Sequence, residues 1–162
     1  MAETTKHLIL LAEDDLAHQD LFKEAVADSG IECDIKTVRD GIELIDYIFA
    51  RNRTDPSLSN PKPNLIVLDL RMPRMSGLQV LQVLQRTQDS ARSPLPPVVV
   101  LTSSDMVEDL SNAYRLGAQS CIRKPIDYSV FAEAVKQTLR YWLELNETRH
   151  TIRRPVAHEI RR

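Results

Sequence analysis

Short runs of apolar residues alternate along the chain with longer segments in which apolar residues recur every three or four positions. The runs at 7–12, 65–68 and 98–101 are apolar on both faces, which is typical of strands buried in the middle of a parallel sheet. The segments 33–38 and 120–123 contain more polar residues, and we expect them nearer the edges of the sheet. The pattern therefore predicts five strands.

Each predicted strand is followed by a segment with the spacing of an amphipathic helix. The first helix is predicted to end at Gly30, and the last to begin after an N-cap at Asp127. Strands that alternate with helices predict an α/β fold with a doubly wound, five-stranded parallel sheet. Helical spacing also predicts the buried faces of the last two helices, which are Val107, Leu110 and Tyr114 in the fourth and Phe131, Val135, Leu139 and Trp142 in the fifth.

Composition narrows the possible classes of function. The chain has 162 residues, of which 43% are hydrophobic, enough for one packed domain with a short extension. Its formal net charge of −2 argues against a nucleic-acid-binding module, which usually has a basic excess. No apolar run approaches the ~20 residues that a membrane span requires. Cys33 and Cys121 are too few for a disulfide framework or a zinc site, so we expect a cytoplasmic protein with reduced thiols.

Two segments do not fit the alternation of strands and helices. Residues 51–64 are rich in Pro, Ser and Asn and are predicted to form an exposed loop. Residues 147–162, the C-terminal arm, are polar and rich in Arg. The sequence therefore predicts one domain over residues 1–146, followed by the arm.

Polar residues gather where the predicted strands end. Glu13, Asp14 and Asp15 follow the first strand, and Asp69 follows the third. If the strand order is 2-1-3-4-5, strands one and three are neighbours, and Glu13, Asp14 and Asp69 converge. Such carboxylates repel one another unless a cation neutralises them, and Mg²⁺ prefers oxygen ligands of this kind. The fourth and fifth strands end in groups suited to phosphoryl oxygens, the Thr102 hydroxyl and the Lys124 ammonium.

Each of these residues taken alone has a purely structural interpretation. Asp69 could form a turn, Asp15 is better placed to cap the first helix than to bind metal, and Lys124 could be a solvated surface charge. Their joint occurrence at successive strand ends, at the edge where open parallel sheets bind ligands, favours a functional site.

Four motifs at these positions resemble the receiver domains of two-component response regulators. The resemblance covers about residues 5–145 and rests on LLAEDD (10–15), LDLRMPRMSG (68–77), VVVLTSS (98–104) and GAQSCIRKP (117–125). It implies a flavodoxin-like fold with strand order 2-1-3-4-5. It also implies that the chain accepts and loses its own aspartyl phosphate and is not a turnover enzyme on external substrates.

The resemblance assigns roles to individual residues. Glu13 and Asp14 would be the acidic pair, with Asp14 a direct ligand of Mg²⁺, and Asp69 would be the phosphoacceptor. The backbone carbonyl of Arg71 would complete the metal site. Thr102 would bind the phosphoryl group, and Lys124 would pair with it.

Further positions near the site follow from the same resemblance. The Lys124–Pro125 bond would be cis. Cys121 stands where many receivers carry an aromatic switch residue, so the signal would pass through Thr102 and the loop after the fourth strand. Arg71 and Ser104 occupy the two positions that help to set the lifetime of the aspartyl phosphate.

The long loop, the YWLELNE ending of the last helix and the arm most resemble phytochrome-associated single-domain response regulators. This implies a sensor histidine kinase as partner, namely a bacteriophytochrome. It also implies a homodimer through the last helices and the C-terminal arm, in which Tyr141, Leu143 and Leu145 supply surplus apolar surface. No DNA-binding module is expected, because the arm is too short for a helix-turn-helix.

Two alternatives stay open. A haloacid-dehalogenase-like phosphatase also uses a strand-end Asp and Mg²⁺, but it carries a second Asp where this chain has Arg71. A pseudo-receiver would act only as a binding module without phosphorylation, but that class usually lacks acidic-pair or acceptor residues that this chain retains.

Overall fold

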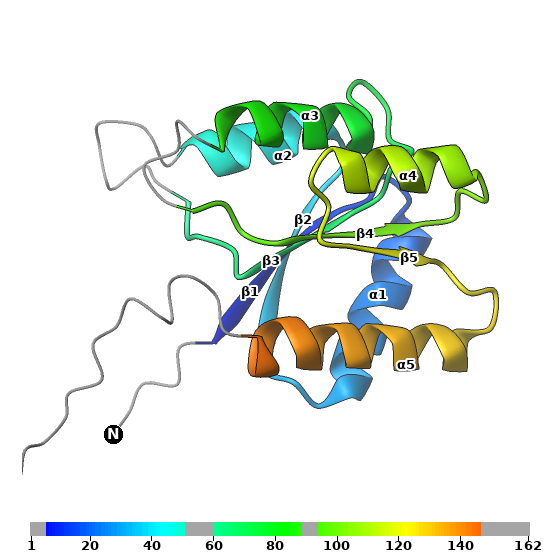
Figure 1. Cartoon of the computed structure of the whole chain (residues 1–162). Coiled ribbons are helices and arrows are strands. Elements are labelled where there is room, and N and C mark those ends of the chain that lie inside the picture. The colour runs from blue at the N-terminus through cyan, green and yellow to red at the C-terminus, as the bar shows by residue number, and fades with distance from the viewer. Residues whose placement is uncertain (1–5, 51–59, 89–93, 147–162) are drawn as a thin grey trace, which may run out of the picture.

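A computed structural model describes residues 6–50, 60–88 and 94–146 of the chain. Its centre is a parallel sheet in the order β2-β1-β3-β4-β5, as the sequence predicted (Figure 1). The strands are β1 (His7–Ala12), β2 (Cys33–Val38), β3 (Leu65–Leu68), β4 (Val98–Thr102) and β5 (Ser120–Arg123). Strands far apart in the sequence are paired, because β1 lies between β2 and β3.

The burial of the strands follows their composition. Every residue of β3 and β4 is buried, whereas β2 and β5 are only partly buried and form the edges of the sheet. Central strands of a doubly wound sheet are covered by helices on both faces, so they require apolar residues at successive positions. The predicted central and edge strands are confirmed.

Helices cover both faces of the sheet. In Figure 1, α1 (Leu16–Ser29) and α5 (Tyr128–Leu139) lie below it, and α2 (Gly41–Phe49), α3 (Gly77–Thr87) and α4 (Val107–Arg115) lie above it. The side chains form one hydrophobic cluster on each face. The tyrosine hydroxyl of Tyr128 donates a hydrogen bond of 2.8 Å to Asp28 and so links α5 to the end of α1.

Local signals determine where the helices begin and end. The Asp15 carboxylate accepts a hydrogen bond from the backbone N–H of His18, and the Asp127 carboxylate accepts one from that of Val130. Gly30 ends α1 in the left-handed conformation, with φ of 72°, which a residue without a Cβ adopts easily. These three predicted helix ends are confirmed.

The end of the last helix differs from the prediction. A π-helical turn (Arg140–Leu145) follows α5, and Leu143 is buried in it while Trp142 is only partly buried. Leu143 follows Leu139 by four residues, so the two lie on one face and belong to the same hydrophobic cluster, against which Trp142 packs. The prediction of Leu143 as surplus surface was therefore wrong, and the predicted burial of Trp142 is confirmed only in part. Tyr141 and Leu145 are exposed, as expected.

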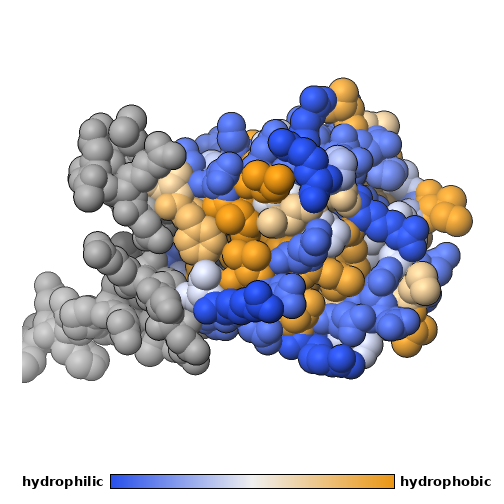
Figure 2. Space-filling view, turned by 90° about the horizontal axis from the view of Figure 1, so that it is seen from above, coloured by the Kyte–Doolittle hydropathy of each residue, from blue (hydrophilic) through white to orange (hydrophobic). Residues whose placement is uncertain are grey.

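The predicted core face of the fourth helix was wrong at Val107 and Tyr114, whereas Leu110 is partly buried. In α4 only Ala113 is buried, whereas the side chains of Val107 and Tyr114 are 73% and 53% exposed. The helix lies over the β5 end of the sheet, next to an edge strand, so little of its surface can be covered. Figure 2 looks onto the face of α2, α3 and α4, where apolar side chains gather among charged and polar ones. The exposed large apolar residues of α2 and α4, with the N-cap of α4, are Ile42, Met106, Val107 and Tyr114.

Two predictions concern segments outside the described residues. Most of the predicted loop at 51–64 and all of the C-terminal arm at 147–162 lie there. Among the helices that are described, none is both long enough and apolar enough to span a membrane.

Candidate functional site

The carboxyl ends of β1 and β3 bring an acidic cluster together. The backbone N–H of Asp69 donates to the carbonyl of Ala12, and that of Glu13 donates to the carbonyl of Val38, both at 3.0 Å. These bonds continue the sheet beyond the strands and hold the following carboxylates at one edge. As a result, carboxylate oxygens of Glu13, Asp14 and Asp69 lie within 4.8 Å of one another.

The members of this cluster differ in exposure. Glu13 and Asp69 are only 3% and 6% exposed, whereas Asp14 is exposed to solvent. Burial raises the pKa of Glu13 above its ordinary value, the Asp69 charge raises it further, and Lys124 only partly offsets both. Three carboxylates that offer hard oxygen donors at one point fit a divalent cation with oxygen ligands. Glu13, Asp14 and Asp69 are the residues that would hold such an ion.

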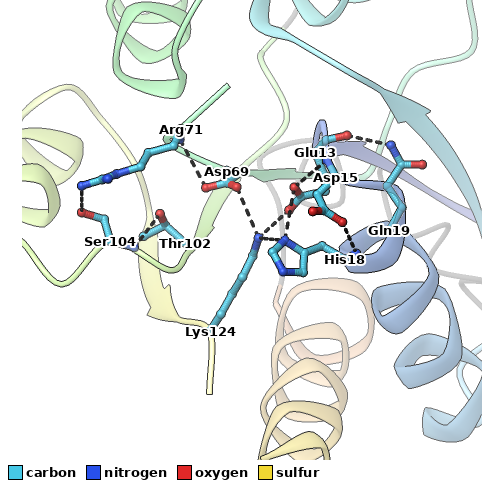
Figure 3. Close-up of polar contacts among 9 residues, drawn as sticks. All are labelled: Glu13, Asp15, His18, Gln19, Asp69, Arg71, Thr102, Ser104 and Lys124. Carbon is cyan, nitrogen blue, oxygen red and sulfur yellow. Dashed lines mark hydrogen bonds and ion pairs between the residues drawn. The ribbon is translucent and has the colours of Figure 1, made fainter. Parts of the chain in front are cut away.

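Lys124 reaches the same carboxylates from the end of β5. Its Nζ lies 3.3 Å from Oδ2 of Asp69 and also forms a short ion pair with Glu13. The side chain is 11% exposed, and the backbone N–H donates 2.8 Å to the carbonyl of Thr102. The ammonium is therefore directed at the acidic cluster from the opposite side of Asp69 to Arg71 (Figure 3).

The Lys124–Pro125 bond differs from the prediction. All described peptide bonds, including this one, are trans. The trans isomer is the intrinsically favoured form of an X-Pro bond, by about 0.5–1 kcal/mol. Lys124 reaches Glu13 and Asp69 with this backbone.

Thr102 and Ser104 form the other side of the site. Thr102 is fully buried, and its hydroxyl accepts a hydrogen bond of 3.2 Å from the backbone N–H of Ser104. Ser104 is itself buried and contacts Arg71, whose backbone N–H donates 3.3 Å to Oδ1 of Asp69. The peptide of Arg71 thus lies beside Asp69, while its side chain extends toward β4 and α4 (Figure 3).

A glycine allows the chain to pass close behind Asp69. Gly77 donates its N–H to the carbonyl of Leu70 at 2.9 Å. A Cβ at this position would collide with the backbone oxygen of Asp69 and lie 2.8 Å from Cα of Leu70. Ser76 starts α3 at the same place with a capping box to Gln79. The turn after Asp69 is therefore held by backbone contacts that only glycine permits.

Some residues near the site were not predicted. Nδ1 of His18 lies 3.5 Å from Nζ of Lys124 and 3.6 Å from Oε1 of Glu13. Its place one helical turn after the acidic pair is the signal that could have identified it. Arg74, with φ of 61°, forms an ion pair with the buried carboxylate of Asp40 and ties the turn to α2. No sequence signal indicates that pair.

Cys121 occupies the predicted switch position and lies next to an aromatic side chain of a neighbouring helix. The hydroxyl of Tyr114, on α4, accepts a hydrogen bond of 3.0 Å from the backbone N–H of Cys121. This bond satisfies a donor on the edge strand β5 and connects that strand to α4.

A cavity of about 300 Å³ opens beside the site, between α1 and the segment that joins β5 to α5. Glu13, Asp69 and Lys124 line its polar end, and Leu21, Phe22 and Phe131 line its apolar part. The side chains of Leu16, Leu21 and Ile126, on these two elements, are exposed. The carboxylate cluster is thus bordered by an accessible apolar surface.

Comparison with known proteins gives the class to which this fold and site belong. Residues 9–136 match the model of the response regulator receiver domain. The chain belongs to this family, whose members are phosphorylated by histidine kinases and bind a divalent metal.

Several relatives resemble the chain over most of its length. It is 34% identical to the "Probable methanogenesis regulatory protein FilR2" of Methanothrix harundinacea, over 87% of this chain and 86% of that protein. It is 31% identical to the response regulator Rcp1 of Synechocystis, over 85% and 89% of the two chains.

Solved structures lead to the same group. The phosphorylated cyanobacterial phytochrome response regulator RcpA superposes with a TM-score of 0.75 at 31% identity, covering 88% of this chain and 98% of that one. The Mn²⁺-bound form of Rcp1 gives a TM-score of 0.73 at 30% identity, covering 87% and 97%. The chain is therefore related to response regulators of phytochromes.

Proposed function

We propose that this chain accepts a phosphoryl group from a sensor histidine kinase on Asp69. The supporting observation is that Glu13, Asp14, Asp69 and Lys124, from the ends of three strands, meet in one site. Carboxylates that are held close together repel one another, and this repulsion costs free energy unless a bound cation offsets it. The chain also belongs to the receiver family, whose members are phosphorylated by histidine kinases.

The proposed reaction transfers a phosphoryl group from an imidazole of the kinase to the carboxylate of Asp69. An oxygen of Asp69 attacks phosphorus and forms a P–O bond, while the bond between phosphorus and the imidazole nitrogen of the kinase breaks and its electron pair stays with that nitrogen. Lys124, 3.3 Å from Asp69, is placed to hold negative charge on the transferred oxygens. The buried hydroxyl of Thr102 is the group proposed to bind the phosphoryl after transfer.

The proposed metal is Mg²⁺, held by Glu13, Asp14, Asp69 and the backbone carbonyl of Arg71. When bound, Mg²⁺ supplies positive charge that offsets the repulsion between the carboxylates and the incoming phosphoryl group. The metal-bound structure of the relative Rcp1 and the close carboxylates of this chain support the assignment.

Acetyl phosphate tests the acceptor. With Mg²⁺ present, the intact chain is expected to gain the mass of one phosphoryl group, and Asp69→Asn is expected to gain none. A cooperative thermal unfolding transition of Asp69→Asn would show that this variant is folded. Modification of Asp69→Asn would reject the acceptor. No acyl phosphate in the intact chain would favour a pseudo-receiver, and turnover of many phosphate esters would favour a phosphatase.

The kinase is proposed to be a bacteriophytochrome, because the relatives include the phytochrome response regulators RcpA and Rcp1. The exposed apolar residues Leu16, Leu21 and Ile126 beside the acceptor are suited to contact a partner protein. Phosphotransfer profiling against the sensor kinases of the source genome is the test. Transfer from a kinase without a light-sensing domain, with none from a phytochrome, would reject the phytochrome link.

We also propose a homodimer through α4, α5, the following π-helical turn and the C-terminal arm, with output through protein contacts instead of DNA. On these elements Val107, Tyr114, Val130, Tyr141 and Leu145 are exposed. A two-fold axis would bring the same patch of each subunit together. Light scattering of the full chain and of a truncation after Asn146 is the measurement. We expect a dimer that weakens on truncation, and monomers in both samples would reject it.

A further inference from the structure

The side chain of Arg71 turns away from the acidic cluster, although its backbone lies beside Asp69. One guanidinium nitrogen is 3.5 Å from the hydroxyl of Ser104 and 4.0 Å from a carboxylate oxygen of Asp109. Figure 3 shows this side chain running from Asp69 toward Ser104, on the opposite side to Lys124. Asp109 belongs to the first turn of α4. The carboxylate of Asp109 on α4 thus helps to orient the Arg71 side chain, whose backbone lies beside Asp69.

The hydroxyl of Ser104 connects Arg71 to Asp109, and its orientation is set by Asp109. It has one proton, which it donates to Asp109 at 2.6 Å. Its lone pairs accept from Arg71 and from the backbone N–H of Met106, at 3.5 and 3.4 Å. Because the carboxylate of Asp109 can only accept, it orients the hydroxyl so that the oxygen faces Arg71. The charge of Asp109 therefore attracts Arg71 directly and also through Ser104.

This link is weak by its geometry. The side chain of Arg71 is 64% exposed, and an exposed ion pair at 4.0 Å contributes little. A phosphoryl group on Asp69 would place a second and stronger anion next to the same residue, because the N–H of Arg71 already donates to Asp69. Two anions then compete for one guanidinium.

We propose that Asp109 is a positioning residue that shortens the lifetime of the aspartyl phosphate by holding the Arg71 guanidinium away from the phosphoryl group. The inference rests on the proposed phosphorylation of Asp69. In hydrolysis, a water oxygen attacks phosphorus on the side opposite to Asp69. The P–O bond to Asp69 breaks, the carboxylate leaves with its electron pair, and the proton of the water passes to solvent. A guanidinium bound across the phosphoryl oxygens obstructs this approach, and Asp109 keeps the approach open.

The test measures the decay of the acyl phosphate after acetyl phosphate is removed. Asp109→Asn is expected to lengthen its lifetime by about two- to fivefold, the range that an exposed ion pair can supply. Glu108→Gln is the matched control, because Glu108 lies in the same first turn of α4, is exposed and has no described contact with Arg71. It loses the same charge, and its lifetime is expected to equal that of the unaltered chain.

A double-mutant comparison separates positioning from a general effect on structure. In an Arg71→Met background, Asp109→Asn is expected to have no effect on the lifetime of the acyl phosphate. In the chain that keeps Arg71, Asp109→Glu retains the charge and is expected to have the same lifetime as the unaltered chain. A lifetime that is unchanged or shorter in Asp109→Asn, or a lengthening that persists without Arg71 or recurs in Glu108→Gln, overturns the proposal. Absence of acyl phosphate in the unaltered chain overturns the proposed function itself. Acyl phosphate without the Asp109 effect overturns only this inference.

Discussion

The helices on the two sides of the site are packed very differently. On the α1 and α5 side, Phe22, Val26, Val135 and Leu139 are all at most 5% exposed. On the other side, α4 buries only Ala113, and its N-cap Met106 makes no side-chain hydrogen bond to the helix. The acidic pair and Lys124 thus adjoin the well-packed region, whereas Asp109, to which the buried Ser104 donates, belongs to the weakly packed α4.

This difference places the site between a firmly packed region and a weakly packed one. A cluster of like charges needs fixed supports, and short contacts from β1, β3 and Lys124 supply them. An element with little buried surface shifts at a low cost in free energy, and α4 is such an element. Ser104 links Thr102 to this helix, because its backbone N–H donates to the Thr102 hydroxyl and its own hydroxyl donates to Asp109. We therefore expect the two regions to respond differently to substitution.

Truncation of one apolar side chain on each side would give the largest contrast in stability. Leu139→Ala, at a fully buried position of α5, is expected to lower the free energy of unfolding by about 2–5 kcal/mol. Val107→Ala, on exposed α4, is expected to change it by no more than ~0.5 kcal/mol. Urea unfolding at one protein concentration measures both. Equal losses would mean that α4 is as firmly packed as α5.

The turn after Asp69 is expected to behave as part of the firm region. Arg74→Ala leaves the buried carboxylate of Asp40 without its cation, which is expected to cost about 1–3 kcal/mol. Arg74→Gly loses the same ion pair but relieves the backbone, because Arg74 has a φ of 61°. The glycine variant is therefore expected to be the more stable of the two in chemical unfolding, and the reverse order would show that backbone strain is unimportant here.

The same pair predicts a dependence on pH. Burial alone would raise the pKa of Asp40, but the N–H of Glu43 and the Arg74 guanidinium outweigh burial and lower it. A carboxylate with a lowered pKa in the folded state contributes stability above its unfolded pKa of about 4, and that stability is lost as the pH falls. The stability difference between the intact chain and Arg74→Ala should therefore shrink below about pH 4. A constant difference from pH 7 to pH 3 would contradict this.

Metal affinity should distinguish two neighbouring aspartates. Asp14 contributes an oxygen to the carboxylate cluster, whereas Asp15 caps α1. Asp14→Ala is expected to weaken Mg²⁺ binding by on the order of tenfold or more, equivalent to about 1.4 kcal/mol or more. Asp15→Ala is expected to change it much less and to lower helix stability instead. Calorimetric titration gives both affinities, and equal losses would shift the metal site by one residue.

The smallest effect is expected where α4 meets the edge strand. Tyr114→Phe removes the hydroxyl that accepts from the N–H of Cys121, with a cost of about 0.5–1 kcal/mol. Hydrogen exchange at the Cys121 amide should become faster, while that at Leu101, in the buried strand β4, should not change. Unchanged exchange at Cys121 would show that the hydroxyl does not protect this edge.

Much of the molecule could be predicted because its signals are local. Alternation of apolar runs and helical patterns located all five strands, and capping residues such as Asp15 and Asp127 marked where helices begin. The acidic cluster was predictable for a related reason. Parallel strands end at one edge of the sheet, so residues that follow strands one and three must meet once the strand order is known.

Only the tertiary structure decided the contacts between segments that are distant in the chain. Arg74 and Asp40 are 34 residues apart, and nothing in their local sequence indicates a partner. The motifs placed Arg71 and Ser104 near the same site, but their mutual contact and the contact of Ser104 with Asp109 appear only in the structure. The exposure of α4 likewise depends on its place beside an edge strand. Local backbone preferences and side-chain periodicity act over a few residues and are visible in the sequence. Which side chains meet across loops depends on the packing of the whole chain.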